Sequence, residues 1–386
     1  MGDSLNLLAA SYADFRRDAE QRLPRFLFDY IDGGAGAEVT LRRNTADWES
    51  VKLTQKVLRD ASTLDCSTQL LGETLAMPLI LAPIGMGGMA ARRGEVQAKR
   101  AADTAGIPFC LSTVGICPME EVAKTSDKPF WFQLYMLKDR GIVQEILDRA
   151  REHGVTTLAF TIDLPVLGTR YRDIRNGMAG GLGPWGKLRS GVIDYLLHPR
   201  WAWDVGLRGG PHGFGNIARY VKQSRNPREY LHWTGTQFDP SVTWHDIAWL
   251  RKIWPGKLVL KGVLDAADAK QAVAVGADGM IVSNHGGRQL DGVSSTAALL
   301  PRIADAVGSE TTLLVDGGVR TGQDLVRALA LGAKAALIGR PWVMALAAGG
   351  EAGLTRYLTL MKQDMRTALG LTGAINARDV GRGVLL

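Results

Sequence analysis

The residues best suited to chemistry stand together in one short stretch, Ser283–Gly292, which reads Ser-Asn-His-Gly-Gly-Arg-Gln-Leu-Asp-Gly. It follows an apolar run and places His285, Arg288 and an aspartate in a turn with three glycines. Imidazole is a general base near neutral pH, and a guanidinium holds a carboxylate through paired hydrogen bonds. Such a cluster just beyond a buried strand is typical of α/β active sites. The alternative is a polar surface loop, because one short motif has little specificity.

Polar or glycine-rich residues also end the other apolar runs of the chain, and two of these endings have the composition of a phosphate site. Glycines and helix N-termini offer backbone N–H groups to phosphate, and arginine adds a charge-assisted hydrogen bond. Asp316 would repel phosphate, so a sugar hydroxyl is its better partner. We therefore expect a phosphate-bearing cofactor or substrate. The two endings are Asp316-Gly317-Gly318-Val319-Arg320 and Gly339-Arg340.

Other residues near the ends of these runs could bind and deprotonate an acid. His285 is the only histidine at such an end, and a carboxylate such as Asp163 would hold its tautomer and stabilise its protonated form. A metal would need several convergent ligands, and only these two residues qualify, so we expect none. Two arginines and two tyrosines could clamp a carboxylate, namely Arg170, Arg288, Tyr30 and Tyr135.

The chain alternates eight short apolar runs with helix-length segments. Apolar strands separated by helices imply parallel pairing with both faces covered, and eight such units predict a closed (β/α)8 TIM barrel. An open doubly wound sheet is the alternative, but no Gly-x-Gly-x-x-Gly follows the first run. In a barrel, functional residues lie at the C-terminal ends of the strands. The runs are Leu79–Pro83, Phe109–Ser112, Phe130–Leu134, Thr157–Thr161, Leu258–Lys261, Met280–Ser283, Leu313–Asp316 and Ala335–Gly339, with helices expected at Arg93–Ala105, Arg140–Glu152, Trp244–Ile253, Ala266–Val275, Ser294–Ala306 and Gly322–Leu331.

Two parts of the chain lie outside this alternation. Residues 1–55 form an N-terminal segment that we expect to be helical at first, over Tyr12–Leu23, and then irregular; residues 56–386 form the barrel. After the fourth strand comes a loop insertion of about residues 164–242. A loop of this length is uncommon unless it has a function.

The insertion is rich in tryptophan and in basic residues. Together these suit a peripheral membrane contact through residues 183–225. A lid over the active site or an oligomer contact is the alternative. The residues are Trp185, Trp201, Trp203, Trp233, Lys187, Arg189, Arg200, Arg208, Arg219, Lys222, Arg225 and Arg228.

The composition is that of an ordinary globular protein, with 386 residues, 46% of them hydrophobic and 22% charged. No apolar run reaches the roughly 18 residues that span a bilayer, and we expect no secretory signal. Three cysteines without a C-x-x-C pair indicate reduced thiols and a cytoplasmic protein. The net charge of +7 permits an anionic ligand or an acidic membrane surface. We expect no nucleic-acid partner.

The motifs together resemble the FMN-dependent α-hydroxy-acid dehydrogenases and oxidases. The likeness runs from Tyr30 to about Gly373, and within the family it is greatest to the bacterial, quinone-linked L-lactate dehydrogenases. It is carried by Leu23-Pro24, Ala82-Pro83, Gln133-Leu134-Tyr135, Thr161-Ile162-Asp163, Lys261-Gly262, Ser283–Gly292 and Asp316–Arg320, and for the branch by Arg92–Gln97 and His198–Gly206.

The resemblance implies roles for the catalytic residues and for those that bind FMN. His285 would take a proton from a 2-hydroxy acid, and Asp163 would orient it. Lys261 would lie at the pyrimidine end of the flavin. The substrate would be held by Arg170, Arg288, Tyr30 and Tyr135, the flavin ring by Ala82, Ile84, Ser112, Gln133, Thr161 and Ser283, and the ribityl phosphate by Asp316, Gly318, Arg320, Gly339 and Arg340.

The resemblance also implies a reaction and its partners. An L-2-hydroxy acid, L-lactate in the branch concerned, would be oxidised to the 2-oxo acid, and the electrons would pass to quinone. The protein would lie on the cytoplasmic side of the inner membrane as a tetramer or larger assembly. The alternatives are an (S)-mandelate or other 2-hydroxy-acid dehydrogenase, a peroxide-forming oxidase, and a barrel that binds a phosphorylated ligand without redox chemistry.

Overall fold

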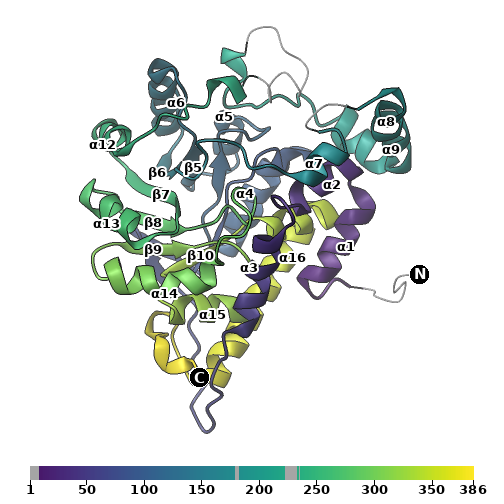
Figure 1. Ribbon diagram of the computed structural model, residues 1–386. Helices are drawn as coiled ribbons and strands as arrows, with labels where there is room; N and C mark the ends of the chain where they lie inside the picture. The colour runs from purple at the N-terminus through teal and green to yellow at the C-terminus, as the bar shows by residue number, and fades with distance from the viewer. Residues whose placement is uncertain (1–7, 179–181, 222–232, 234) are drawn as a thin grey trace.

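A ring of parallel strands forms the centre of the molecule, in a computed structural model that describes residues 8–178, 182–221, 233 and 235–386 (Figure 1). Eight strands of this described part pair in the order β3-β10-β9-β8-β7-β6-β5-β4. A parallel bridge between Leu81 and Phe109 closes the ring. The predicted (β/α)8 barrel is confirmed. The strands are β3 (Leu79–Leu81), β4 (Cys110–Ser112), β5 (Phe130–Leu134), β6 (Val155–Thr161), β7 (Lys257–Val263), β8 (Gly279–Val282), β9 (Thr312–Val315) and β10 (Ala335–Ile338).

The strands of the ring are buried on both faces. One set of side chains points into the ring, where Ile80, Trp131, Val259 and Leu314 belong to one buried cluster. The alternate set packs against the surrounding helices in a second, larger core. Burial on both faces explains why these strands are apolar throughout rather than alternating.

The helices predicted between the strands form close to their expected bounds and surround the ring (Figure 1). Several begin at side chains that cap the first turn: Asp139, Asp265 and Thr321 each accept a hydrogen bond from a backbone N–H group there. The helices are α4 (Gly94–Ala105), α5 (Met119–Ala123), α6 (Arg140–Glu152), α12 (Trp244–Ile253), α13 (Ala266–Ala274), α14 (Thr296–Val307), α15 (Gly322–Ala330) and α16 (Arg340–Thr372).

The N-terminal segment forms three helices instead of becoming irregular. They are α1 (Tyr12–Arg22), α2 (Arg25–Asp32) and α3 (Val39–Ser50). The sequence offered no sign of α3, because its first turn has no side-chain cap and few of its residues are apolar. Tertiary packing stabilises it: Trp48 is buried, and its indole Nε1–H donates to the carbonyl of Gly317 at 2.8 Å.

A short hairpin closes the end of the barrel away from the C-terminal strand ends. Its strands are β1 (Thr68–Leu70) and β2 (Glu73–Leu75), which pair antiparallel. Leu70 and Leu75 pack into the cluster inside the ring. The hairpin therefore covers the interior cluster at this end of the barrel.

The insertion after β6 forms a group of short helices at the rim of the barrel (Figure 1). Trp201 anchors it, because its side chain is buried and its Nε1–H donates to the carbonyl of Met89 at 2.8 Å. Trp201 is thus a packing residue and not part of an exposed surface. The elements are α7 (Tyr171–Arg175), α8 (Pro184–Lys187), α9 (Asp194–Leu197), α10 (Pro199–Trp201) and π-helical turns at Leu188–Ile193 and Ala202–Leu207.

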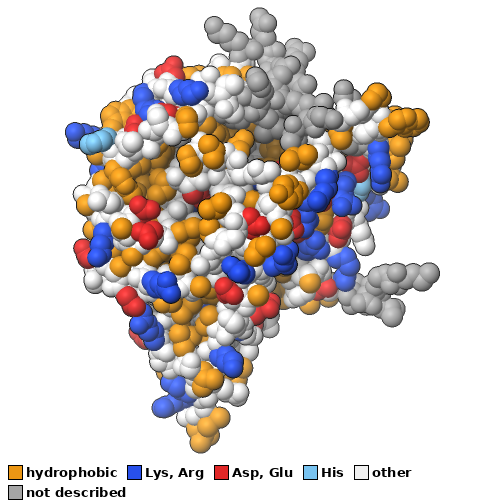
Figure 2. Space-filling model, in the orientation of Figure 1, with side chains coloured by type: hydrophobic (Ala, Val, Ile, Leu, Met, Phe, Trp, Pro, Cys, Tyr) orange, Lys and Arg blue, Asp and Glu red, His pale blue; other side chains and the backbone are white. Residues whose placement is uncertain are grey.

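Other apolar residues of the insertion are exposed. Trp185 is 82% exposed, and Leu196, Leu197 and Trp203 are also largely exposed. Figure 2 shows hydrophobic side chains gathered around α8 and α9, with Lys and Arg side chains beside them. Across the described residues, no helix is both long and apolar enough to cross a bilayer. Lys222, Arg225 and Arg228, which we expected to add charge here, lie outside the described residues.

A buried pair of amides joins α3 to the loop after β8. The Nδ2–H of Asn44 donates to Asn284 Oδ1 at 2.8 Å, and the Nδ2–H of Asn284 donates to Asn44 Oδ1 at 2.7 Å. Removing the Asn44 amide would leave one N–H group of Asn284 unpaired in a buried setting, although Asn284 keeps its hydrogen bonds to the Ser294 carbonyl and the Gly287 N–H group.

We expect Asn44→Ala to lower the free energy of unfolding by about 1–3 kcal/mol, the usual cost of an unsatisfied buried polar group. Urea denaturation followed by tryptophan fluorescence would measure it. Asn376→Ala serves as the matched control, because the Asn376 amide makes an exposed hydrogen bond. Equal stability of the two variants would contradict the role of the amide pair.

Candidate functional site

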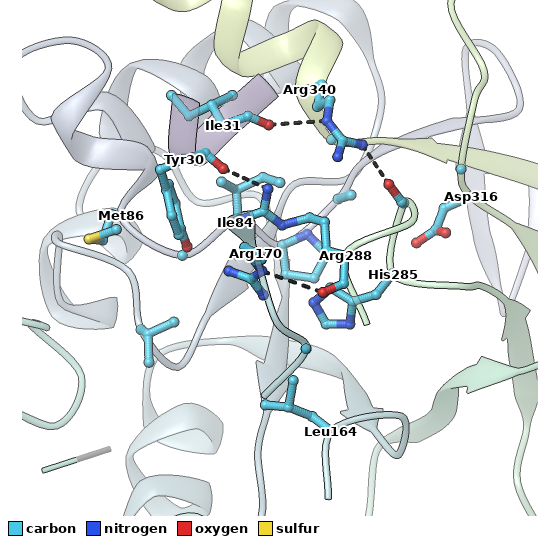
Figure 3. Close-up of a pocket in the computed structure, with 18 of the residues that line it drawn as sticks. Tyr30, Ile31, Ile84, Met86, Leu164, Arg170, His285, Arg288, Asp316 and Arg340 are labelled. Carbon is cyan, nitrogen blue, oxygen red and sulfur yellow. Dashed lines mark hydrogen bonds between the residues drawn. The ribbon is translucent and has the colours of Figure 1, made fainter. Parts of the chain in front are cut away.

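A cavity of about 710 Å³ opens at the C-terminal ends of the strands. The barrel architecture predicts the site at this end. Figure 3 shows Tyr30 of α2 beside charged side chains from the insertion and from the loops after β8, β9 and β10. Of the residues predicted from the sequence, those that line the cavity are Tyr30, Ala82, Ile84, Tyr135, Arg170, Lys261, His285, Arg288, Asp316, Gly318, Arg320, Gly339 and Arg340.

His285 lies in the wall of this cavity in a left-handed backbone conformation, with φ of 57°. Its ring Nδ1 lies 2.9 Å and 3.1 Å from the two carboxylate oxygens of Asp163. An ionised carboxylate only accepts hydrogen bonds, so Nδ1 carries the proton and Nε2 is left as the basic nitrogen. Burial lowers the pKa of His285 and outweighs the Asp163 carboxylate, which raises it. The imidazole is therefore neutral and ready to accept a proton at neutral pH.

Asp163 reaches His285 because the neighbouring strand carries a glycine. Gly262 has a φ of 116°, and a Cβ there would lie 2.6 Å from Cβ of Asp163. The carboxylate itself is charged: burial alone would raise the pKa of Asp163, but His285 lowers it below its usual value. A fixed negative charge behind the imidazole stabilises the imidazolium that forms on protonation.

Lys261 is a buried cation in the same wall. Its Nζ donates to Ser283 Oγ at 2.8 Å and lies 3.0 Å from Asp316 Oδ2. Burial would lower the pKa of Lys261, but the carboxylates of Asp316 and Asp163 outweigh it and raise that pKa. The site therefore holds a permanent positive charge that could stabilise negative charge on a bound ring.

Ser112, Gln133 and Thr161 end β4, β5 and β6 and form one hydrogen-bonded chain. Ser112 Oγ donates to Gln133 Oε1 at 2.9 Å, and Gln133 Nε2 donates to Thr161 Oγ1 at 3.0 Å. The structure thus brings the three predicted residues together. They and Ser283 are not among the residues that line the cavity, so their contact with a ligand stays a prediction.

Two arginines bind the carbonyls at the C-terminal end of α2. Arg288 Nη1 donates to the carbonyls of Tyr30 at 2.6 Å and Gly33 at 2.8 Å. Arg340 donates to those of Ile31 at 3.1 Å and Gly33 at 2.8 Å. The last carbonyls of a helix have no partner within it and carry partial negative charge, so they are good acceptors for a guanidinium. This arrangement fixes the end of α2, and places Tyr30 beside Arg288.

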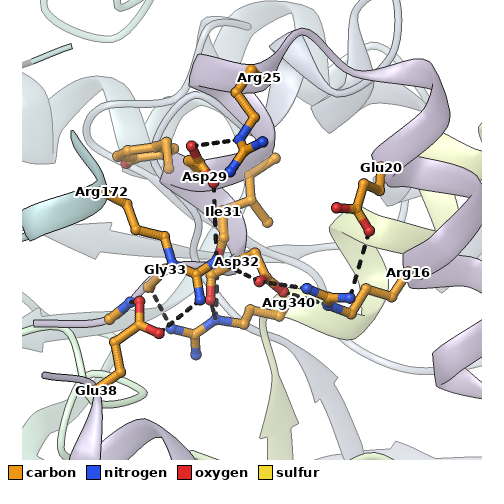
Figure 4. Close-up of polar contacts among 12 residues, drawn as sticks. Arg16, Glu20, Arg25, Asp29, Ile31, Asp32, Gly33, Glu38, Arg172 and Arg340 are labelled. Carbon is orange, nitrogen blue, oxygen red and sulfur yellow. Dashed lines mark hydrogen bonds and ion pairs between the residues drawn. The ribbon is translucent and has the colours of Figure 1, made fainter. Parts of the chain in front are cut away.

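A network of charged residues holds α2 against the insertion (Figure 4). Asp32 accepts from Arg16 Nε at 2.7 Å and from Arg172 Nη1 at 2.8 Å, and Arg172 Nη2 donates to Glu38 at 2.7 Å. Burial alone would raise the pKa of Asp32, but Arg16 and Arg172 keep it lowered. The sequence analysis did not identify these residues, although the charged run at Arg170–Asp173 marks the place.

The side of the cavity next to Tyr30 has an excess of positive charge. Arg288 lies 4.8 Å from the centre of the Tyr30 ring, and Arg170 lies 6.0 Å from it. Burial, followed by the Arg170 charge, lowers the pKa of Arg288 to about 9. Arg288 is therefore still charged at neutral pH, and a carboxylate arriving between these guanidiniums would be strongly favoured.

The other side of the cavity suits a phosphorylated sugar chain. Asp316 Oδ1 is buried and has no hydrogen-bond partner among the described residues, so a hydroxyl donor from a ligand would satisfy it. Gly318 has a φ of 98°, and a Cβ there would lie 2.0 Å from the Asn44 carbonyl oxygen. Arg320 lines this side, and α16 begins here at Arg340 with its positive end toward the cavity.

Apolar residues complete the cavity, and apart from Val114, which the family resemblance marks as a pocket position, the sequence analysis missed them. They come mainly from the insertion and from the loop that precedes α12, and no motif distinguishes them from ordinary core residues. Phe238, for example, packs on the ring of Tyr135 with centroids 4.8 Å apart. These residues are Val114, Leu164, Leu167, Ile174, Met178, Phe214 and Phe238.

Comparison with known proteins agrees with this geometry. Residues 19–386 match the family described as FMN-dependent dehydrogenase. The L-lactate dehydrogenase of Stenotrophomonas maltophilia (strain K279a) is 54% identical over 380 residues, which cover 98% of this chain and 99% of that protein. The L-lactate dehydrogenase of Xanthomonas campestris pv. campestris (strain 8004) is 55% identical over 379 residues, covering 98% and 97%.

Two solved structures also match nearly the whole chain. The monotopic membrane protein (S)-mandelate dehydrogenase matches with a TM-score of 0.91 and 36% identity, covering 98% of this chain and 99% of that one. A mandelate oxidase with (S)-4-hydroxymandelic acid matches with a TM-score of 0.82 and 34% identity, covering 96% and 98%.

We expect Asp163→Asn to lower the pKa of His285 further, because the imidazolium loses the negative charge beside Nδ1. Imidazole titration by NMR on protein with ¹⁵N-labelled histidine would measure the change. His198, which lies 3.4 Å from a different carboxylate, Asp194, should titrate as in the wild type. A His285 titration that stayed in place or moved upward would disprove the assigned coupling.

Proposed function

The chain belongs to the family of FMN-dependent dehydrogenases, and we propose that it oxidises L-lactate to pyruvate and passes the electrons to quinone. The observation that carries this proposal is the pairing of a neutral, Asp163-held His285 with two arginines in one cavity. A base and a carboxylate clamp together are what the oxidation of a 2-hydroxy acid requires. The relatives named L-lactate dehydrogenase, at 54–55% identity, favour lactate over mandelate.

FMN is the cofactor of this family, and the cavity has groups that suit each of its parts. Arg320, Arg340 and the glycine-rich turn at Gly318 would hold the phosphate, and the free oxygen of Asp316 would accept a ribityl hydroxyl. Lys261 would supply positive charge to the pyrimidine ring. When bound, FMN accepts the two electrons that leave the substrate.

The side chains of the clamp would orient the 2-hydroxy acid for proton removal. Arg170 and Arg288 bind its carboxylate, and the Tyr30 ring lies against both guanidiniums. The hydroxyl is then presented to His285 Nε2, which takes the proton. Asp163 stabilises the imidazolium that results. Val114, Leu167 and Phe214 enclose this side of the cavity and exclude water from the reacting groups.

The exposed apolar surface of α8–α10 is the membrane contact in this proposal. Trp185, Leu196, Leu197 and Trp203 project from short helices that also carry basic residues, the composition of an interfacial anchor. A structural neighbour is described as a monotopic membrane protein. Binding at the cytoplasmic face of the inner membrane would bring the flavin site close to membrane quinone.

We expect anaerobic L-lactate to bleach the flavin absorbance of the purified protein much faster than glycolate or (S)-mandelate does. His285→Ala should retain FMN and lose flavin reduction by about 10²–10⁴-fold, the usual contribution of a general base. Stopped-flow absorbance would measure both. Faster bleaching by (S)-mandelate would favour the mandelate alternative, and rapid peroxide formation in air would favour an oxidase.

We expect Leu196→Ser with Leu197→Ser to weaken binding to anionic lipid vesicles at least tenfold, because two exposed apolar side chains no longer enter the interface. Vesicle sedimentation would measure binding, and flavin reduction by lactate should be unchanged. The matched control is Leu371→Ser with Leu386→Ser, which alters two exposed leucines outside the insertion. If both double variants sedimented like the wild type, the assigned anchor would be wrong.

A further inference from the structure

Asp173 is a carboxylate of the cavity wall that the mechanism above does not use. It lies in α7, and its Oδ2 is 3.9 Å from Nη1 of Arg170. Its side chain is only 13% exposed. Its other oxygen, Oδ1, is buried and has no hydrogen-bond partner in the part of the chain that the structure describes. A buried carboxylate that is only loosely paired is costly, so it calls for an explanation.

Asp173 does not hold the insertion in place. That role belongs to Arg172, whose guanidinium bonds to Asp32 and Glu38 at 2.8 Å and 2.7 Å. Asp173 instead faces the arginines that bind the substrate. Its position suits an electrostatic role in the clamp rather than a structural one.

The charges around Asp173 come from three elements. Burial raises the pKa of Asp173; Arg288, Arg170 and Arg172 oppose this, and Asp29 of α2 adds to it. The net result is a raised pKa. Asp173 is therefore a group whose protonation state responds to a change of charge in the clamp.

We propose that Asp173 is the counter-ion of the substrate clamp, balancing Arg170 and Arg288 until an anionic ligand arrives and then taking up a proton. This inference rests on the proposed function of the same site. A substrate carboxylate and the Asp173 carboxylate would share the same guanidiniums. Two neighbouring carboxylates in a buried site cannot both stay charged without a penalty, so binding one favours protonation of the other.

This arrangement limits how tightly the site holds an anion. At high pH the charged Asp173 competes with the ligand for the arginines, and at low pH the competition disappears. The same competition would speed the release of the 2-oxo acid product, which carries the same carboxylate as the substrate. A clamp of arginines alone would hold substrate and product too tightly for turnover.

Isothermal titration calorimetry of the FMN-loaded protein with oxamate tests the proposal. Oxamate is a carboxylate that is not oxidised, and titrations in two buffers of different ionisation enthalpy report the protons taken up. We expect Asp173→Asn to bind oxamate about tenfold more tightly at pH 8, since one opposing charge is gone. The two proteins should converge at low pH, and the variant should take up fewer protons. His285 is present in both proteins, so the difference between them reports Asp173.

The matched control is Asp194→Asn. Asp194 is another buried carboxylate of the insertion whose pKa is raised by burial, and it does not line the cavity. Its loss should leave oxamate binding unchanged. Oxamate binding by Asp173→Asn that is equal to or weaker than in the wild type at pH 8 would overturn the proposal.

A second variant guards against poor folding of Asp173→Asn. Asp163→Asn with His285→Asn removes both the imidazole and the buried carboxylate that loss of the imidazole would leave unpaired, so any uptake that remains on oxamate binding at pH 6 comes from Asp173. Uptake should persist in this variant, and its absence would overturn the proposal. Because oxamate is not turned over, proton linkage can be intact in wild-type protein whose flavin L-lactate does not reduce, and that result would overturn the proposed function alone.

Discussion

The pairing of two buried arginines with the end of α2 is the interaction on which the rest of the active site depends. Arg288 and Arg340 donate to the carbonyls of Tyr30, Ile31 and Gly33. A buried guanidinium needs acceptors, and the last carbonyls of a helix need donors, so each side satisfies the other. The contact joins the N-terminal segment to the loops after β8 and β10. It explains why a segment outside the barrel contributes Tyr30 to the lining of the cavity.

The electrostatics of the cavity follow from this contact. Cations are fixed around the cavity before any ligand arrives: Lys261 by Ser283 and Asp316, and Arg288 by carbonyls. Fixed positive charge stabilises negative charge on the ligand without the cost of reorganisation. Among the described residues, three carboxylates stand beside these groups: Asp163 next to the imidazole, Asp173 near Arg170 and Asp316 next to Lys261. The barrel makes this possible because parallel strands deliver residues distant in the chain to one mouth.

The insertion after β6 has two roles, one for its first part and one for its later helices. Its first part carries Arg170 and Asp173 into the cavity, and its later helices expose apolar residues to the surroundings. Trp201 fastens the later helices to the barrel through the Met89 carbonyl. The surface proposed to meet the membrane is thereby attached to the barrel that carries the cavity.

The barrel and most of the site could be predicted from the sequence by itself. The eight apolar runs imply buried strands, because a strand covered on both faces is apolar over most of its length. Asp163, Lys261, His285 and Asp316 are recognisable as polar groups at or near the ends of these runs. Helix caps can also be predicted from the sequence, because a capping side chain bonds to backbone N–H groups in the first turn of its own helix.

Other features depend on contacts between residues that are distant in the chain, and only the tertiary structure determines them. The helix α3 is stabilised by the burial of Trp48 and by the amide pair of Asn44 with Asn284. The arginines bind carbonyls, which every residue has and no sequence pattern marks. In the sequence, Asp173 is only one charged residue in a charged run. Its burial beside Arg170 is a result of folding. Local sequence records the propensity of a segment, whereas burial and pairing arise only when distant segments meet.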